Sequence, residues 1–200
     1  DLIITDHHIT LDKKPDALAI VHSLKMCGTA VAWCLIRKYI KEDLARELLQ
    51  FVCIATIADM IPLTGLGRVF VREGLKVLNR SRNIGLIALA DECKLSIGDL
   101  RSYEVGHIIS PRLNAIGRME HAIDGLRLLC TKDPLKAKRL AKLLCDANTQ
   151  RQQLTVTAIE EARVMVGEST KKIHIMHSEK WSQGIIGLVA ARVCEEYYRP

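Results

Sequence analysis

Long apolar runs are missing from this 200-residue chain. No stretch approaches the ~18 consecutive apolar residues that a membrane-spanning helix needs. A recognisable secretory signal peptide is also missing. Both absences argue against an integral membrane protein, and we expect no membrane partner.

The chain also lacks any C-x-x-C pair, and its seven cysteines are odd in number. Most of them lie in apolar runs, such as Cys53 in "FVCIATI". This pattern favours buried, reduced thiols over a disulfide framework or a zinc site. We therefore predict a cytoplasmic protein.

The composition is that of a folded protein with a basic surface. Hydrophobic residues make up 48% of the chain and charged residues 26%, which is enough to build a core. The formal net charge is +6. Such a charge attracts polyanions such as nucleic acids, although many ordinary basic enzymes share it. Because the first residue is Asp and not Met, we expect an internal piece of a longer protein.

Short β-rich runs and amphipathic stretches alternate along the first two thirds of the chain. The run "LIIT" at 2–5 ends in polar residues, which is typical of an inner strand of a parallel sheet, and "LAIVHS" at 18–23 predicts a second strand. A third strand is predicted from the alternation at 172–177. Helical spacing predicts helices over 28–40, 42–61 (stopped by Pro62), 68–81, 86–92 and 183–198.

The stretch 135–166 contains neither Gly nor Pro. As a single helix it would be about 48 Å long at ~1.5 Å per residue. Its polar middle, "DANTQRQQ", suits an exposed connection between two domains. The predicted fold class is α/β, with a parallel-sheet domain over 1–134, a connecting helix over 135–166 and the beginning of a second α/β domain over 167–200.

The first candidate site is the triplet Asp6, His7 and His8 at the end of the first predicted strand. Imidazole and carboxylate groups are good ligands for divalent transition metals. Adjacent residues that leave a strand point in different directions, so one His can face a metal and the other a substrate, with the Asp orienting either ring. The alternative is a polar strand end whose groups satisfy one another.

Asp59 is the second candidate, because it interrupts the apolar run "ATIADMIPL". An unpaired buried charge is costly, so such a carboxylate is hydrogen-bonded, capping or bound to a cation. Both a cap of the following turn and a metal ligand remain open.

Two further segments carry basic residues that suit phosphate. In "SPRLNAIGR" the side chains of Arg112, Asn114 and Arg118 alternate with small and apolar residues, and the flanking Pro and Gly predict a shaped loop. A solvated basic loop is the alternative. Between 132 and 151, six basic residues outnumber two acidic ones. This face of the long helix is either simply solvated or lines a groove for a nucleic acid strand.

Taken together, these segments resemble the DHH phosphoesterase superfamily, and within it the RecJ-type single-stranded-DNA-specific exonucleases. They occur in family order and cover nearly the whole chain. The segments that carry the resemblance are "ITDHH" at 4–8, "GTAVAW" at 28–33, "ATIADMIPL" at 55–63, "SPRLNAIGRMEHA" at 110–122, "NTQRQ" at 148–152, and "WSQGIIGLVAARV" at 181–193 with "YYRP" at the end. The last of these resembles the opening of a DHHA1 domain.

The resemblance implies metal-dependent hydrolysis of single-stranded DNA from its 5′ end, in DNA repair and recombination. Two Mn²⁺ or Mg²⁺ ions in the full-length protein would activate a water and neutralise the phosphate. The implied partners are single-stranded DNA and protein partners such as a single-strand-binding protein or a helicase.

The resemblance also implies residue roles. His7 and Asp59 match metal ligands, Asp6 matches the orienting member of the triplet, and His8 faces the scissile phosphate. The side chains matched to the substrate path are Arg112, Asn114 and Arg118 in the first basic segment and Arg192 in the second domain.

Some family motifs are not in this sequence. Earlier aspartate motifs would precede residue 1 and a glycine-rich histidine motif would follow residue 200, so we expect the 200-residue chain alone to have little or no nuclease activity. Ser182, Ser110 and His107 also depart from the usual residues. Two other functions stay open: a DHH phosphodiesterase for short oligonucleotides or cyclic dinucleotides, and a non-catalytic RecJ-like replication scaffold.

Overall fold

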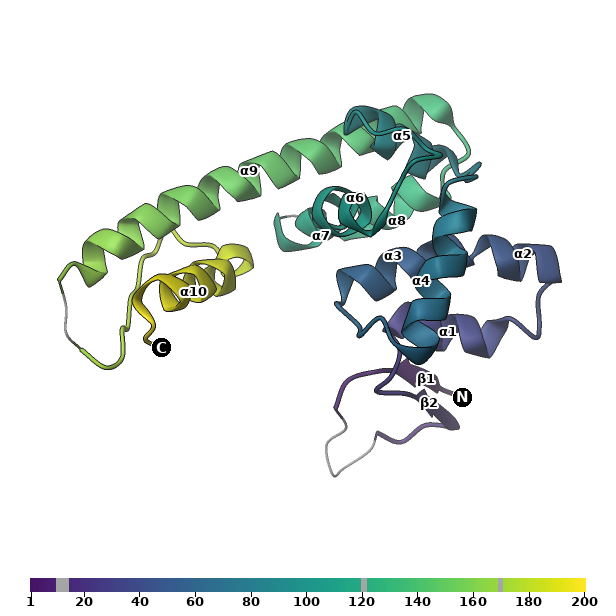
Figure 1. Ribbon diagram of the computed structural model, residues 1–200, viewed down its shortest axis with the longest axis horizontal. Coiled ribbons are helices and arrows are strands. Elements are labelled where there is room, and N and C mark those ends of the chain that lie inside the picture. The colour runs from purple at the N-terminus through teal and green to yellow at the C-terminus, as the bar shows by residue number, and fades with distance from the viewer. Residues whose placement is uncertain (10–14, 120–121, 169–170) are drawn as a thin grey trace. The chain divides into compact units, whose positions relative to one another are not determined.

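The computed structural model describes residues 1–9, 15–119, 122–168 and 171–200 (Figure 1). Packing divides the chain into two compact units, Asp1–Pro111 and Arg112–Pro200, and each is described by itself. This division concerns packing only, so the functional domain boundaries at 134 and 166 stay predictions. In the described part of the chain, no helix is both long and apolar enough to cross a membrane.

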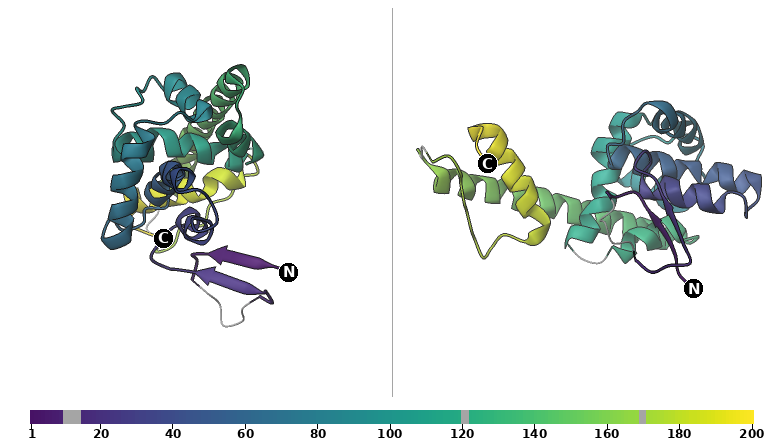
Figure 2. Two further views of the ribbon diagram at one scale, coloured as in Figure 1. Left: turned by 90° about the vertical axis from the view of Figure 1, so that its right-hand side faces the viewer. Right: turned by 90° about the horizontal axis from the view of Figure 1, so that it is seen from below.

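The first unit begins with a small parallel sheet, seen as two adjacent arrows in Figure 2. Strand β1 (Ile3–Asp6) pairs with β2 (Ala19–His22) in a register that sets Asp6 opposite His22. The strands predicted at 2–5 and 18–23 are confirmed, and the two pair in parallel. Since the carboxyl ends of parallel strands lie at one edge, the residues after β1 and β2 come close together.

Helices and the loops between them make up the rest of the described first unit. The helices at 28 and 42 begin at their predicted residues, and those at 65 and 84 begin within three residues of the predicted 68 and 86. Their bounds are α1 Gly28–Ile36, α2 Glu42–Glu47, α3 Leu49–Ala58, α4 Gly65–Leu78, α5 Ile84–Glu92, α6 Ser102–Glu104, and the π-helical turn η1 Val105–Ile109.

The helix predicted over 42–61 is instead two helices. It is divided at Leu48, which closes α2 and opens α3. The helix α3 then ends at Ala58, before Pro62, because Asp59 leaves helical geometry (φ −82°, ψ 2°) and Met60 takes a left-handed φ of 51°. This early end places Asp59 at the carboxyl terminus of α3.

The core of the first unit forms where α3 packs against α1 and α4. Cys27, Ala30, Val52 and Phe70 make one buried cluster there. Gly74 lets the backbones of α3 and α4 approach closely, since a Cβ at this position would lie 2.5 Å from the carbonyl oxygen of Leu49 and would also overlap the Cβ of Cys53. The packed α3 is the platform that carries Asp59.

The second unit consists of helices α7 (Ser110–Met119, whose first two residues belong to the first unit), α8 (Ile123–Cys130), α9 (Pro134–Val166) and α10 (Gln183–Tyr197). The single long helix predicted at 135–166 is confirmed by α9. Its start is fixed by Asp133, whose carboxylate accepts from the backbone N–H groups of Leu135 and Lys136. Its end is fixed by Gly167, which has a positive φ of 52°.

Helices α9 and α10 pack through an apolar cluster with a charged border. The buried residues of the cluster are Ala158, Ala162, Val166, Ile185, Val189 and Val193. At its border, the Arg163 guanidinium contacts Glu196 through two hydrogen bonds of 2.6 and 2.8 Å. These bonds lower the pKa of the Glu196 carboxyl.

Two further predictions of local structure are wrong. The segment "SPRLNAIGR" is not a loop but lies in α7. The wider π turn directly before it, in which the Ser110 N–H bonds to the Val105 carbonyl, accommodates a proline that lacks an N–H of its own. The alternating segment 172–177 is not a strand, because within the described residues no neighbouring strand pairs with it. A backbone hydrogen bond runs from the N–H of His174 in this segment to the carbonyl of Pro200.

Candidate functional site

The Asp-His-His triplet stands at the carboxyl edge of the sheet. Asp6 is the last residue of β1, and His7 and His8 follow it directly. The Ser23 N–H bonds to the Asp6 carbonyl at 3.2 Å, which continues the β1–β2 ladder to the edge. The position is the one that the sequence predicts for functional groups in an α/β fold.

Asp6 orients His8. One carboxylate oxygen of Asp6, Oδ1, accepts from the backbone N–H of His8 at 3.3 Å and lies 2.8 Å from its Nδ1. The hydrogen bond from the His8 ring, with the backbone N–H groups of His7 and His8, lowers the pKa of Asp6 to about 2. An ionised carboxylate only accepts, so Nδ1 of His8 carries the proton in this pair. The other ring nitrogen of His8, whose side chain is 78% exposed, is left to meet a ligand.

The ring of His7 lies beside that of His8, with 4.4 Å between the ring centroids, and it meets Asp59. Its Nε2 lies 3.9 Å from Oδ2 of Asp59, although the two residues are far apart in the sequence. Asp59 stands at the carboxyl terminus of α3, where the helix dipole is negative and disfavours a carboxylate. No hydrogen bond to the Asp59 carboxylate occurs among the described residues, so the capping alternative has no support there. A cation between Asp59 and His7 would relieve this repulsion.

The pair fits a divalent metal ion. Two ligand atoms that each lie ~2.1 Å from one ion are at most about 4.2 Å apart, and the observed 3.9 Å is within that limit. An imidazole nitrogen and a carboxylate oxygen suit Mn²⁺, and Mg²⁺ accepts carboxylates with waters. The described residues contain no group of three His, Cys, Asp or Glu side chains arranged for a metal. His7 and Asp59 thus supply a partial ligand set.

Two residues beside the triplet were not predicted as site residues. The ring of His22, at the end of β2, lies with Nε2 2.7 Å from the His8 carbonyl oxygen. A Cβ on Gly28, the first residue of α1, would lie 3.2 Å from Cδ2 of His7. The only sequence signal for His22 is its place at the end of the second predicted strand.

The predicted substrate-path residues all lie in the second unit. On α7, Arg112 is half-buried and Asn114 is exposed. The backbone of Arg118 is part of α7, but its side chain lies outside the described part of the structure. Arg192 on α10 is bonded to Glu196 at 2.9 Å and reaches Glu195 at 3.5 Å. The structure therefore brings together Asp6, His7, His8 and Asp59, and these four residues form the candidate site.

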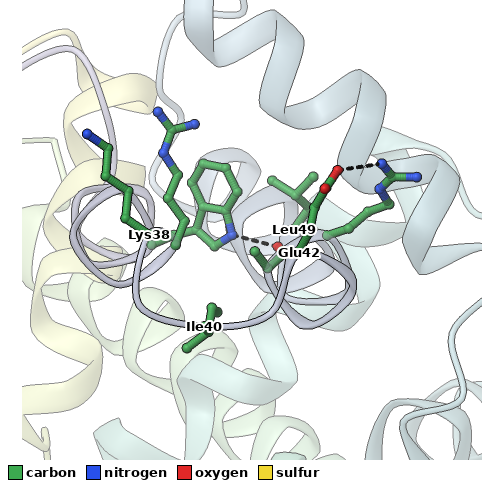
Figure 3. Close-up of a pocket in the computed structure, with 8 residues that line it drawn as sticks. Lys38, Ile40, Glu42 and Leu49 are labelled. Carbon is green, nitrogen blue, oxygen red and sulfur yellow. Dashed lines mark hydrogen bonds and ion pairs between the residues drawn. The ribbon is translucent and has the colours of Figure 1, made fainter.

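A separate pocket of about 420 Å³ lies between α1 and α2 (Figure 3). Its wall is the indole of Trp33, whose Nε1–H donates to the Ala45 carbonyl at 2.7 Å, and the Arg37 guanidinium lies 5.2 Å from the ring centroid. Arg46 and Glu42 pair across the other side at 3.2 Å. The Trp33 bond ties α1 to α2 behind the core.

We expect Trp33→Phe to destabilise the protein by about 1 kcal/mol, because it deletes this hydrogen bond and leaves the Ala45 carbonyl without its donor. The ring contact with Phe70 (5.8 Å between centroids) is retained in part. Urea unfolding of the wild type and the variant measures the change. An unchanged midpoint would show that water replaces the indole donor at no cost.

Comparisons of the sequence and of the structure with known proteins both find RecJ exonucleases. No protein-family model matches the chain. The single-stranded-DNA-specific exonuclease RecJ of Bacillus subtilis (strain 168) is 34% identical over 211 residues, covering 100% of this chain and 27% of the relative. A crystal structure of exonuclease RecJ bound to manganese superposes with a TM-score of 0.85 at 29% identity, covering 98% of this chain and 52% of that chain.

This chain resembles a part of RecJ over its whole length. A further solved structure agrees: RecJ in complex with Mg²⁺ from Thermus thermophilus gives a TM-score of 0.77 at 30% identity, over 99% of this chain and 32% of that one. The predicted resemblance and the α/β fold class are both confirmed. The chain spans only about a quarter of the length of the RecJ of Bacillus subtilis.

Proposed function

We propose that the protein containing this RecJ-type chain is a metal-dependent exonuclease that hydrolyses single-stranded DNA from the 5′ end. The observation that carries the proposal is the approach of His7 to Asp59, 3.9 Å apart at the carboxyl edge of the sheet. The similarity to single-stranded-DNA-specific exonucleases supports the activity and the substrate. The similar RecJ structures that contain manganese or Mg²⁺ support these ions as the cofactor.

Each residue of the site has a distinct task in this proposal. His7 and Asp59 hold an ion, completed by ligands from elsewhere in the full-length protein, where we propose two ions. Bound metal supplies an activated water and neutralises phosphate charge. Asp6 fixes the His8 ring through Nδ1, so that Nε2 is presented toward the scissile phosphate. When Nε2 of His8 is protonated, it donates to a phosphate oxygen.

The second unit is proposed to bind the DNA strand. Arg112, Asn114 and Arg118 on α7 and Arg192 on α10 supply the donors for phosphate oxygens. Arg192 must exchange its carboxylate partners, Glu195 and Glu196, for a phosphate. The net positive charge of +6 favours the approach of DNA. A cytoplasmic location and a single-strand-binding protein or helicase as a protein partner are proposed as well.

The test uses the full-length protein with oligonucleotides labelled at either end. With Mn²⁺ or Mg²⁺, we expect the 5′ label to be released first, from single strands in preference to duplexes, and no release in EDTA. Preferential digestion of di- to pentanucleotides over long strands would instead favour a phosphodiesterase for short oligonucleotides. Absence of metal-dependent hydrolysis on every substrate would favour a scaffold.

A further inference from the structure

The backbone that follows β1 is held by a histidine from the neighbouring strand. Nε2 of His22 lies 2.7 Å from the carbonyl oxygen of His8. A carbonyl only accepts, so Nε2 of His22 carries the proton and donates. The register of the sheet sets His22 opposite Asp6, so this bond closes the edge just beyond the last strand pair.

A glycine supports the ring of His7. Gly28 opens α1 with an ordinary helical backbone, since its φ is not positive. A Cβ there would lie 3.2 Å from Cδ2 of His7, a tight contact, and 3.5 Å from Nε2, an ordinary van der Waals contact. The ring of His7 therefore packs against the α1 backbone closely enough that a methyl group at position 28 would push it by a few tenths of an ångström.

We propose that His22 and Gly28 are positioning residues for the metal-facing triplet, an inference that rests on the proposed function. His22 fixes the His8 peptide group, and Gly28 sets how far the His7 ring turns toward Asp59. The contact from His22 on β2 acts on His8, and the contact from Gly28 on α1 acts on His7. Together they determine the separation of 3.9 Å between His7 Nε2 and Asp59 Oδ2. Neither residue touches the metal or the substrate.

Metal affinity separates this role from a general role in folding. Loss of a group that orients ligands costs about 10- to 100-fold in metal affinity. Since His22 is at the surface edge of a two-stranded sheet, its loss should affect the melting temperature little. Replacing Gly28 by Ala should weaken metal binding, because the added methyl group displaces His7. The same change should leave folding stability equal or higher, because Ala is favoured over Gly in a helix.

The first experiment measures Mn²⁺ affinity by calorimetry on the full-length protein with MnCl₂. His22→Ala is expected to weaken binding about tenfold, at the lower end of the effect of orienting groups, with little change in melting temperature. His22→Asn restores a side-chain N–H donor and is expected to recover part of the affinity. The matched control is His177→Ala, an exposed histidine of the second unit.

The second experiment uses Gly28→Ala. A displacement of a few tenths of an ångström disturbs His7 less than the complete loss of an orienting group, which costs about 10- to 100-fold in metal affinity, so we expect Mn²⁺ binding to weaken about three- to tenfold. The melting temperature should stay the same or rise. Gly187→Ala is the matched control, since Gly187 lies within α10 and a Cβ there meets nothing within 4 Å.

The outcomes separate this inference from the function it rests on. If the wild type binds Mn²⁺ and both His22→Ala and Gly28→Ala bind it with the same affinity, the positioning role is overturned and the proposed function stands. If both variants bind Mn²⁺ more weakly but also melt at a clearly lower temperature, the loss reflects folding and the positioning role is again overturned. No Mn²⁺ binding or hydrolysis by the wild type would contradict the proposed function itself.

Discussion

Asp59→Asn in the full-length protein is expected to lower metal-dependent hydrolysis of single-stranded DNA by more than about 100-fold, the upper end of the loss seen when only an outer orienting group is removed. The carboxylate stands at the negative end of α3, 3.9 Å from His7 Nε2, and asparagine keeps its shape while removing the charge that holds a cation. Steady-state rates with a 5′-labelled oligonucleotide and Mn²⁺ measure the effect.

The matched control for this variant is Asp91→Asn, an exposed aspartate near the end of α5. It removes the same charge from the same unit without touching the site. The Asp59 variant should also fold at least as well as the wild type, because the unfavourable charge at the helix terminus is gone. Hydrolysis by Asp59→Asn at the rate of the control would remove Asp59 from the ligand set.

Gly74→Ala is expected to destabilise the protein by about 1–3 kcal/mol, the cost of inserting a methyl group into a packed core. A Cβ at position 74 would lie 2.5 Å from the Leu49 carbonyl oxygen and would also overlap the Cys53 side chain. Backbone and Cβ atoms cannot turn away, so α3 and α4 must separate. Since α3 carries Asp59, metal binding should weaken along with stability.

Urea unfolding of Gly74→Ala beside Gly187→Ala measures this cost. Both substitutions add one methyl group inside a helix, but the methyl group at position 187 enters open space. The Gly187 variant should be equally stable or more stable by up to about 1 kcal/mol, the difference in helix propensity between Ala and Gly. If the two variants unfold at the same urea concentration, the α3–α4 contact is looser than the structure indicates.

The sequence predicts those parts of the fold that local patterns determine. The strands at 2–5 and 18–23, the helix predicted over 135–166 and the position of the triplet follow from apolar spacing and turn residues. The error at "SPRLNAIGR" arose because Pro111 and Gly117 look like loop residues, whereas a π-helical turn just before Pro111 lets the helix continue. The strand expected at 172–177 failed because alternation alone provides no pairing partner.

The candidate site is likewise only partly predictable from the sequence. The residue types of His7 and Asp59 mark them as candidates, but only the packing of α3 against α1 and α4 brings the two side chains together. The contacts of His22 and Gly28 depend on register and on close approach through space, which no local pattern encodes. The roles of Arg112, Asn114, Arg118 and Arg192 stay predictions.

The central claim is that His7 and Asp59 hold the same metal ion. A double-mutant cycle of Mn²⁺ affinity tests it directly, with His7→Ala, Asp59→Asn and the double variant measured by calorimetry on the full-length protein. If both side chains bind one ion, each single variant loses most of the affinity and the double variant loses little more. Losses that add fully in the double variant would show that the two residues act independently, and would contradict the account.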